Sequence, residues 1–141
     1  IAITERTAVS ARHTTFYLEA GPEDGVPIIL VHGWPELAIS WRHQIPVLAG
    51  LGFRVIAPDM RGYGRSSRHD RYDDYRMEDC VADLLELLES AGLEKAVWVG
   101  HDFGAAIVWA LASHHRFPSG QGDLVSRICQ GLYHAAYHYR Y

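Results

Sequence analysis

Cysteine is scarce in this sequence, which contains only Cys80 and Cys129. Two cysteines are too few for the disulfide framework of a small secreted domain, so we expect the protein in a reducing compartment. Lysine is rarer still: Lys95 is the single lysine among 13 basic residues, which we attribute to coding bias and not to function. The formal net charge is −4, and no basic stripe runs along the chain. The sequence therefore excludes nucleic acid as a main partner.

Long apolar runs are also absent. A membrane-spanning helix needs about 20 predominantly apolar residues, and no run here approaches that length. The stretch Ile1–Ser10 has neither the basic n-region nor the apolar core of a signal peptide. We therefore predict a cytoplasmic protein with no membrane partner. Because the chain does not begin with Met, we expect a fragment or a processed chain.

The residues that are present are typical of one globular domain. The 141 residues are 48 % hydrophobic and 21 % charged, which excludes wholesale disorder. The β-forming stretch Thr14–Leu18 predicts one or two antiparallel strands between Thr7 and Gly21. Three short apolar runs have the composition of strands buried on both faces, namely Val26–Val31, Phe53–Ala57 and Ala96–Val99.

A helical repeat separates the last two predicted strands. Apolar residues recur there at helical spacing, at Met77, Val81, Leu84, Leu85 and Leu88. The acidic residues predicted to face outward are Glu78, Asp79, Asp83, Glu86 and Glu89. Gly92 stands where a glycine commonly ends a helix, and Ala105–Ala112 is a further predicted helix. Strands that alternate with helices predict an α/β fold with a mostly parallel sheet and crossover helices.

The first chemical motif lies between the third apolar run and the helix after it, and reads Gly100-His101-Asp102-Phe103-Gly104. Small residues two before and two after the central residue allow a sharp strand-to-helix turn, which is the geometry of a nucleophile elbow. The central residue is Asp102, and a carboxylate can attack a saturated carbon to form an alkyl ester. The alternative is that Asp102 simply N-caps the following helix. The pentapeptide alone does not decide between these two roles.

The second motif, His32-Gly33-Trp34-Pro35-Glu36, directly follows Val26–Val31. A backbone N–H just past that strand can meet the N–H of Phe103, and two such donors make an oxyanion hole. Because sites of open α/β sheets lie at the carboxyl ends of the strands, we predict a function for this loop. An ordinary tight loop is the alternative. For His32 itself we favour a hydrogen-bonded structural histidine.

The third motif follows Phe53–Ala57 and reads Pro58-Asp59-Met60-Arg61-Gly62-Tyr63-Gly64-Arg65-Ser66-Ser67. Its Gly-x-Gly does not complete a dinucleotide-binding fingerprint, and no helix is predicted directly after it. We interpret the segment as a structural turn packed near the site.

In this order, and with Ser40-Trp41-Arg42-His43-Gln44 between the second and third motifs, the chain resembles the α/β-hydrolase superfamily. Within that superfamily it is most similar to the soluble epoxide hydrolases. The resemblance covers about residues 12–115 of one partial domain formed by residues 1–141, and the tail at 116–141 diverges. It implies the N-terminal part of an α/β-hydrolase fold, with the cap domain and the C-terminal strands missing.

The resemblance also implies a mechanism. Asp102 would be the nucleophile, the amides of Trp34 and Phe103 would be the oxyanion donors, and the bond before Pro35 would be cis. The implied supporting residues are His32, Gly33, Pro35, Gly100, His101 and Gly104. The implied substrate is a small apolar epoxide, which would form an alkyl ester on the carboxylate that water then hydrolyses to a diol. No metal or organic cofactor is implied.

In that family the cap tyrosines, the relay acid and the catalytic histidine lie well downstream of the elbow, whereas this chain ends at Tyr141. We therefore expect that the chain alone does not turn over epoxides. His134 and His138 are four residues apart, but no Cys or acidic residue nearby completes a metal-ligand set, so no metal site is predicted. An uncovered strand at the edge of a partial sheet would favour self-association.

Two other functions stay open. A dehalogenase uses the same ester chemistry on a carbon–halogen bond, but dehalogenase relatives usually carry a different residue after Pro35, so Glu36 favours an epoxide. A catalytically silent fragment or interaction module is the alternative from another class, because no histidine base is recognisable.

Overall fold

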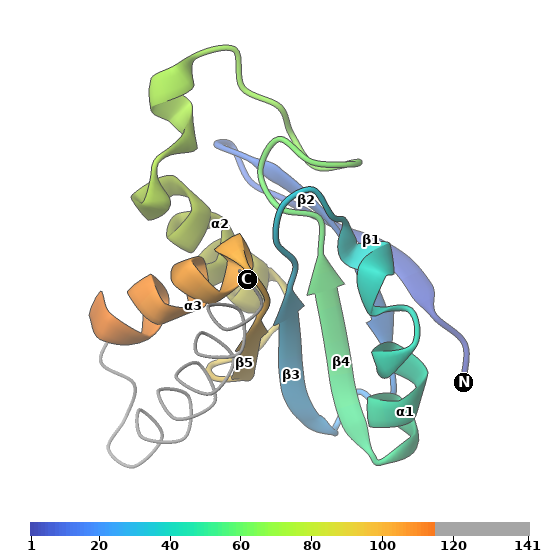
Figure 1. Ribbon diagram of the computed structural model, residues 1–141. Helices are drawn as coiled ribbons and strands as arrows, with labels where there is room; N and C mark the ends of the chain where they lie inside the picture. Colours follow the sequence, from blue (N-terminus) through green and yellow to red (C-terminus); the bar gives the residue numbers. More distant parts are fainter. Residues whose placement is uncertain (115–141) are drawn as a thin grey trace, which may run out of the picture.

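One five-stranded sheet with the order β1-β2-β4-β3-β5 organises the computed structural model, which describes residues 1–114 (Figure 1). The strands are β1 (Thr4–Val9), β2 (Thr14–Ala20), β3 (Val26–Val31), β4 (Phe53–Pro58) and β5 (Val97–Gly100). β1 and β2 form an antiparallel hairpin, and β2 pairs antiparallel with β4. β3 pairs in parallel with both β4 and β5. The predicted α/β fold and its strands are confirmed.

Helices cover both faces of the sheet. α1 (Gln44–Gly50) lies on one face, and α2 (Met77–Ser90) and α3 (Phe103–His114) lie on the other (Figure 1). Short 3-10 helices, η1 (Ala38–Trp41) and η2 (Tyr72–Tyr75), precede α1 and α2. α1 and η1 were not predicted from the sequence. A helix of seven residues is too short to display an apolar repeat, so periodicity gives no signal for it.

The core has two parts, one on each face of the sheet. On the first face, Ile45 and Ala49 of α1 pack with Leu30 of β3 and Val55 of β4. On the second face, apolar residues of α2 and α3 pack against Ile29, Val31 and Ile56 and around the fully buried Trp98: these are Val81, Leu84, Leu87, Leu88, Ile107, Val108 and Leu111. Both faces of β3 and β4 are therefore buried, which explains their continuous apolar runs.

The predicted helix at residues 77–88 is confirmed as α2, and its end at Gly92 is confirmed by a left-handed φ of 70° at that glycine. One part of the prediction was wrong. Asp83, expected to face outward, is only 3 % exposed. The reason is its partner: Arg61 donates two hydrogen bonds to the Asp83 carboxylate, from Nε at 2.7 Å and from Nη2 at 2.8 Å. A buried carboxylate is tolerated when it is paired and hydrogen-bonded in this way.

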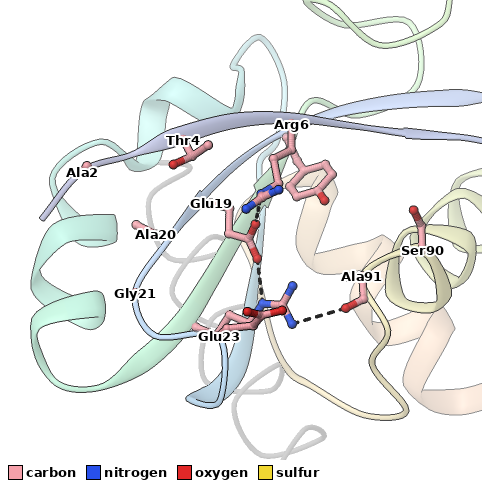
Figure 2. Close-up of a pocket in the computed structure, with 11 residues that line it drawn as sticks. Ala2, Thr4, Arg6, Glu19, Ala20, Gly21, Glu23, Ser90 and Ala91 are labelled. Atoms are coloured by element: carbon pink, nitrogen blue, oxygen red, sulfur yellow. Dashed lines mark hydrogen bonds and ion pairs between the residues drawn. The ribbon is translucent and has the colours of Figure 1, made fainter.

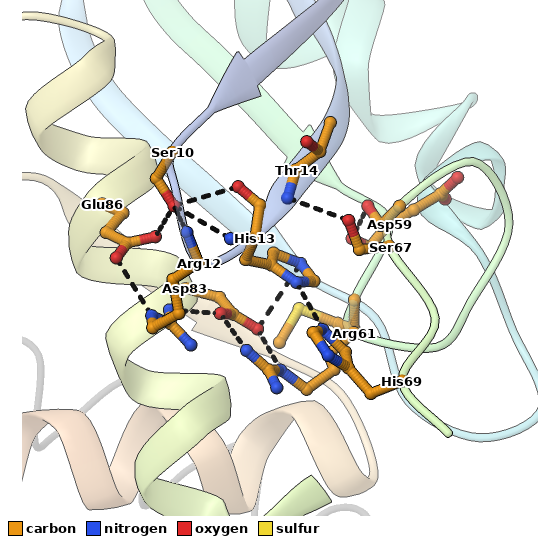
Figure 3. A network of polar contacts seen from close by, with 12 residues as sticks. Ser10, Arg12, His13, Thr14, Asp59, Arg61, Ser67, His69, Asp83 and Glu86 are labelled. Atoms are coloured by element: carbon orange, nitrogen blue, oxygen red, sulfur yellow. Dashed lines mark hydrogen bonds and ion pairs between the residues drawn. The ribbon is translucent and has the colours of Figure 1, made fainter. Parts of the chain in front are cut away.

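Asp83 is the centre of a polar network that joins three segments of the chain (Figure 3). Arg12, from the turn between β1 and β2, also donates to Asp83, and its Nε donates to Glu86 of α2. His13 lies with Nε2 at 3.5 Å from Asp83, and its ring stacks on that of His69. The network thus ties the β1–β2 turn and the loop after β4 to α2.

Three further observations concern residues 1–114. No helix in this range is long and apolar enough to cross a bilayer. β5 is the last strand in the sheet order, next to β3, as expected for an edge of the partial sheet; the self-association expected there stays a prediction. Cys80 is a buried free thiol, and burial raises its pKa to about 11.

The network around Asp83 predicts a large loss of stability when this carboxylate is removed. In Asp83→Ala the buried Arg61 guanidinium has no counter-ion, and we expect a loss of about 3–5 kcal/mol in the free energy of unfolding. Urea unfolding followed by circular dichroism measures this loss. Glu5→Ala is the matched control, because the pair between Glu5 and Arg65 is more than half exposed; its loss should stay within about 1 kcal/mol. Equal losses in the two variants would contradict the assigned role of Asp83.

Stability should also fall in mild acid. Burial lowers the pKa of His13, an effect opposed by the Asp83 charge and reinforced by Arg61, His69 and Arg12. The unfolded chain therefore binds the proton more readily than the folded chain. The contribution of neutral His13 is complete above its unfolded pKa of about 6.5, and it is lost as the pH falls through the lowered folded value.

His13→Gln should therefore flatten the decline of the unfolding free energy below about pH 6.5. The exposed Leu51 offers a control that carries no titratable group, since Leu51→Gln should leave the decline as it is in the wild type. Urea unfolding at a series of pH values decides the matter, and the expectation fails if both variants show the wild-type slope.

Candidate active site

The turn from β5 into α3 places Asp102 in a conformation that is unusual for its residue type. Its φ is 55°, and it is the one non-glycine residue of the described range with a left-handed backbone. The turn is closed by two backbone hydrogen bonds, from Gly104 N–H to His101 O and from Ala105 N–H to Asp102 O. A non-glycine residue in this region carries strain of about 1–3 kcal/mol, which the surrounding structure must offset. The predicted sharp strand-to-helix turn is confirmed.

Three glycines make this turn sterically feasible. A Cβ at Gly100 would lie 2.6 Å from Ala105 Cα, and a Cβ at Gly104 would meet the carbonyl oxygens of Val31 and His32. A Cβ at Gly33 would contact Asp102 Cβ and would lie 2.6 Å from His101 O. Each of these approaches involves backbone that cannot move aside. The supporting glycines of the sequence motifs are therefore positions where backbone segments touch.

The loop after β3 brings a backbone donor to Asp102. Trp34 N–H donates to Asp102 Oδ2 at 3.1 Å, and Glu36 N–H closes the loop on Gly33 O at 3.0 Å. The bond between Trp34 and Pro35 is cis, as the resemblance implied. Trp34 is 69 % exposed, and its hydrogen bond to the elbow is made by its backbone amide. The structure thus brings together the nucleophile candidate and the first of the two predicted donors.

The second predicted donor is the amide of Phe103. Phe103 is the first residue of α3 and directly follows Asp102. First-turn amides of a helix have no intrahelical acceptor, so they are donors for groups outside the helix. Whether this amide acts on the carboxylate stays a prediction. Asp102 also occupies the N-cap position of α3, so the capping alternative agrees with its place in the chain. Its bond to Trp34 nevertheless reaches beyond its own helix.

His32 is buried, with 1 % of its surface exposed, and both ring nitrogens have partners. Its Nε2 accepts from Met60 N–H at 2.9 Å, and its Nδ1 lies 2.9 Å from Gly33 O. Burial lowers the pKa of His32, an effect opposed by the Gly33 carbonyl and by the Asp59 and Glu36 charges. The prediction of a hydrogen-bonded structural histidine is confirmed.

The loop after β4 packs beside the site, as predicted, and several of its residues have contacts that the sequence analysis did not assign, Asp59 and Tyr63 among them. Asp59 Oδ1 accepts from Ala38 N–H at 2.8 Å, which ties this loop to the loop after β3. The ring of Tyr63 lies edge-on to His32, with 5.1 Å between centroids. Burial raises the pKa of Tyr63, and the Asp102 charge raises it further. The signal available in the sequence was only the position of both residues in the third motif.

His101 lies on the exposed side of the elbow. Its Nδ1 is 3.6 Å from Glu36 Oε2, and both side chains are substantially exposed. The pair therefore links the residue before Asp102 to the end of the loop that carries Trp34. Exposed pairs of this kind contribute little to stability.

A polar pocket elsewhere on the molecule does not belong to this site (Figure 2). Its wall includes Glu19, which ion-pairs with Arg6 and accepts from Arg54 Nε at 2.7 Å. Arg54 lies near the start of β4, whereas Asp102 follows the end of β5. The pocket thus lies at the opposite end of the parallel strands. Within residues 1–114, no group of three His, Cys, Asp or Glu side chains is arranged to hold a metal ion, and His134 and His138 lie outside the described residues.

Known proteins are similar to this chain in sequence and in fold. The family described as the alpha/beta hydrolase fold matches residues 26–128. The chain is 58 % identical over 93 residues to Epoxide hydrolase A of Mycobacterium tuberculosis, covering 65 % of this chain and 29 % of that protein. It is 45 % identical over 96 residues to Bifunctional epoxide hydrolase 2 of Sus scrofa, covering 68 % of this chain and 17 % of that protein.

Solved structures agree with this result. Epoxide Hydrolase A from Mycobacterium thermoresistibile superimposes with a TM-score of 0.75 and 45 % identity, over 79 % of this chain and 35 % of that one. An epoxide hydrolase from Vigna radiata superimposes with a TM-score of 0.76 and 36 % identity, over 79 % of this chain and 36 % of that one. The match thus spans about a third or less of each relative. The chain belongs to the α/β hydrolase fold family, and its relatives include hydrolases named for their action on epoxides.

Proposed function

We propose that the whole protein is an epoxide hydrolase in which Asp102 is the nucleophile. One observation carries the proposal: Asp102 stands at φ 55° on the turn between β5 and α3, with Trp34 N–H donating to its Oδ2 at 3.1 Å. A carboxylate that is held by a backbone donor on a sharp turn at the carboxyl end of a sheet is suited to attack a bound electrophile. The names of the relatives support an epoxide as that electrophile.

The first step forms an ester. An oxygen of the Asp102 carboxylate attacks a ring carbon of the epoxide, and the bond from that carbon to the ring oxygen breaks. The ring oxygen takes a proton from a general acid, which in the family comes from cap tyrosines. The carboxylate charge is consumed and a neutral hydroxyalkyl ester remains. General acid help of this kind contributes about 10²–10⁴ in rate.

The second step hydrolyses the ester. Water attacks the ester carbonyl carbon while a histidine base, paired with an acid in the family, accepts its proton. The negative charge then moves onto the carbonyl oxygen, where the Trp34 amide and the Phe103 amide would stabilise it. Collapse of this intermediate breaks the bond to the alkyl oxygen, which takes the proton of the newly formed carboxyl group, so that the diol leaves and the carboxylate is restored. The proton held by the histidine returns to the general acid that was deprotonated in the first step. Removing one such donor costs about 10²–10³ in rate.

The epoxide proposal has a rival in carbon–halogen cleavage, since the same carboxylate could displace a halide. Glu36 after Pro35 favours the epoxide, and so do the names of the relatives. A silent fragment or interaction module predicts no covalent chemistry at Asp102. We propose a cytoplasmic location, which the low cysteine content of the sequence supports.

A reactive aryl epoxide should alkylate Asp102 slowly and once. We expect an adduct with the full mass of the epoxide, because ring opening loses no leaving group, and peptide mapping should place it on Asp102. Asp102→Asn is the matched control, since it keeps the size of the side chain while removing the charged nucleophile. A matched alkyl bromide should label less, and preferential labelling by the bromide would favour the dehalogenase. Intact-mass spectrometry that finds no adduct from either reagent would favour the silent fragment.

The 141-residue chain should not release diol over many turnovers. Hydrolysis needs a histidine base, yet His32 is bonded on both nitrogens and His13 is engaged with His69. Chromatography of the products should therefore find no more diol than one equivalent of protein. Sustained diol release that disappears in Asp102→Asn would show that a base is supplied within this chain.

A further inference from the structure

The peptide group between Gly33 and Trp34 carries both the oxyanion donor and the partner of His32. Its N–H belongs to Trp34 and donates to Asp102 Oδ2, while its C=O belongs to Gly33 and lies 2.9 Å from His32 Nδ1. A peptide group is planar because its C–N bond has partial double-bond character. Its C=O and N–H therefore cannot rotate independently of each other. A group that holds the carbonyl therefore also aims the N–H.

The proton on the His32 ring can be located from its neighbours. Met60 N–H is always a donor, and it points at Nε2 at 2.9 Å, so Nε2 must be the acceptor. In a neutral imidazole the other nitrogen then carries the proton. Nδ1–H consequently donates to Gly33 O, and the burial that lowers the pKa of His32 keeps the ring neutral.

We propose that His32 is a positioning residue, whose Nδ1–H orients the Gly33–Trp34 peptide so that Trp34 N–H points at Asp102. The role of that N–H as an oxyanion donor rests on the proposed function. The orientation itself rests on the two hydrogen bonds of the ring and the planarity of one peptide group; Gly33 O also accepts from Glu36 N–H at 3.0 Å, a contact that both His32 variants below leave in place.

The ring can act as a reference point because the loop behind it is fixed. Asp59 N–H donates to Phe16 O, and Ser66 Oγ donates to Asp59 O at 2.6 Å while it accepts from Phe16 N–H. Ser67 Oγ accepts from Thr14 N–H at 3.0 Å, so β2 holds the loop at several points (Figure 3).

The loop after β4 also holds the far end of the loop after β3, which carries Trp34. Asp59 Oδ1 accepts from Ala38 N–H at 2.8 Å, and Asp59 itself is 4 % exposed. Tyr63 lies edge-on against the His32 ring and restricts its rotation. The loop after β3 is therefore held at His32 and at Ala38, on both sides of Trp34.

Two substitutions separate the contacts of His32. In His32→Asn the side-chain amide occupies the place of Nδ1 and can still donate to Gly33 O, while the contact with Met60 is lost. In His32→Gln the side-chain carbonyl reaches the place of Nε2 and can still accept from Met60 N–H, while the donor to Gly33 O is lost. Both variants remove ring packing, so both should unfold at a lower temperature than the wild type.

The readout is the amide resonance of Trp34 in a ¹⁵N-labelled 141-residue chain. In the wild type this resonance should move as Asp102 titrates, and Asp102→Asn should abolish that movement. We expect His32→Asn to retain most of the movement and His32→Gln to lose most of it, whatever their relative melting temperatures. The rate of Asp102 labelling by the aryl epoxide should fall about 10-fold to 100-fold in His32→Gln and much less in His32→Asn, as expected for misaligned reacting groups. Retention of the movement in His32→Gln, or equal loss in both variants, would overturn the proposal.

The wild-type chain alone provides a test that does not depend on the folding of any variant. The ring ¹⁵N shifts of His32 at neutral pH should report a proton on Nδ1 and a bare Nε2. A proton on Nε2 would overturn the proposal outright. Should the wild type show the expected tautomer and the titrating Trp34 resonance but no epoxide adduct, the positioning role would stand and the proposed function would fail.

Discussion

The parallel pairing of β3 with β5 is the constraint on which the site depends. Its register places Val31 opposite Gly100, and His101 N–H extends the ladder by donating to Val31 O at 3.0 Å. The two chains therefore leave the sheet side by side, one toward Gly33 and Trp34 and the other toward Asp102. Because Gly33 has no Cβ, the two backbones meet closely enough for an amide to reach the carboxylate. A shift of register by one residue would reverse the facing of every side chain on β5 and would separate these groups.

The strained backbone of Asp102 is stabilised by the well-anchored segments that surround it. Asp102 holds an unfavourable backbone conformation, and it does so between segments that are anchored elsewhere. The loop after β4 supplies that anchorage: its Arg61 is paired with Asp83 of α2, its serines are bonded to β2, and its Met60 amide reaches His32. A sheet with helices on both faces thus carries a polar layer at the carboxyl ends of its strands, and the candidate site lies at the outer surface of that layer.

Much of this arrangement could be predicted from the sequence, and the exceptions have physical reasons. The buried strands, α2 and the elbow at Asp102 follow from apolar runs, helical spacing and glycine placement, which are local signals. α1 was missed because a helix of seven residues is too short to show an apolar period. Asp83 was misplaced because its burial depends on Arg61, a residue on another element, and periodicity carries no information on such a partner. The contacts of Asp59 and Tyr63 were unassigned for the same reason: the side chains are visible in a motif, but the tertiary neighbours are not.

The buried thiol of Cys80 has a consequence for the chemical selectivity of the chain toward electrophiles. Thiolates react with strained ethers and alkyl halides far faster than carboxylates in water, so an accessible low-pKa cysteine would compete with any aspartate nucleophile. With burial raising its pKa to about 11, Cys80 is present as thiolate to only about one part in ten thousand at neutral pH, and its position in the core excludes reagents. In the described part of the chain the thiol is thus withdrawn into the interior, while the carboxylate of Asp102, the proposed nucleophile, stands at the end of the sheet.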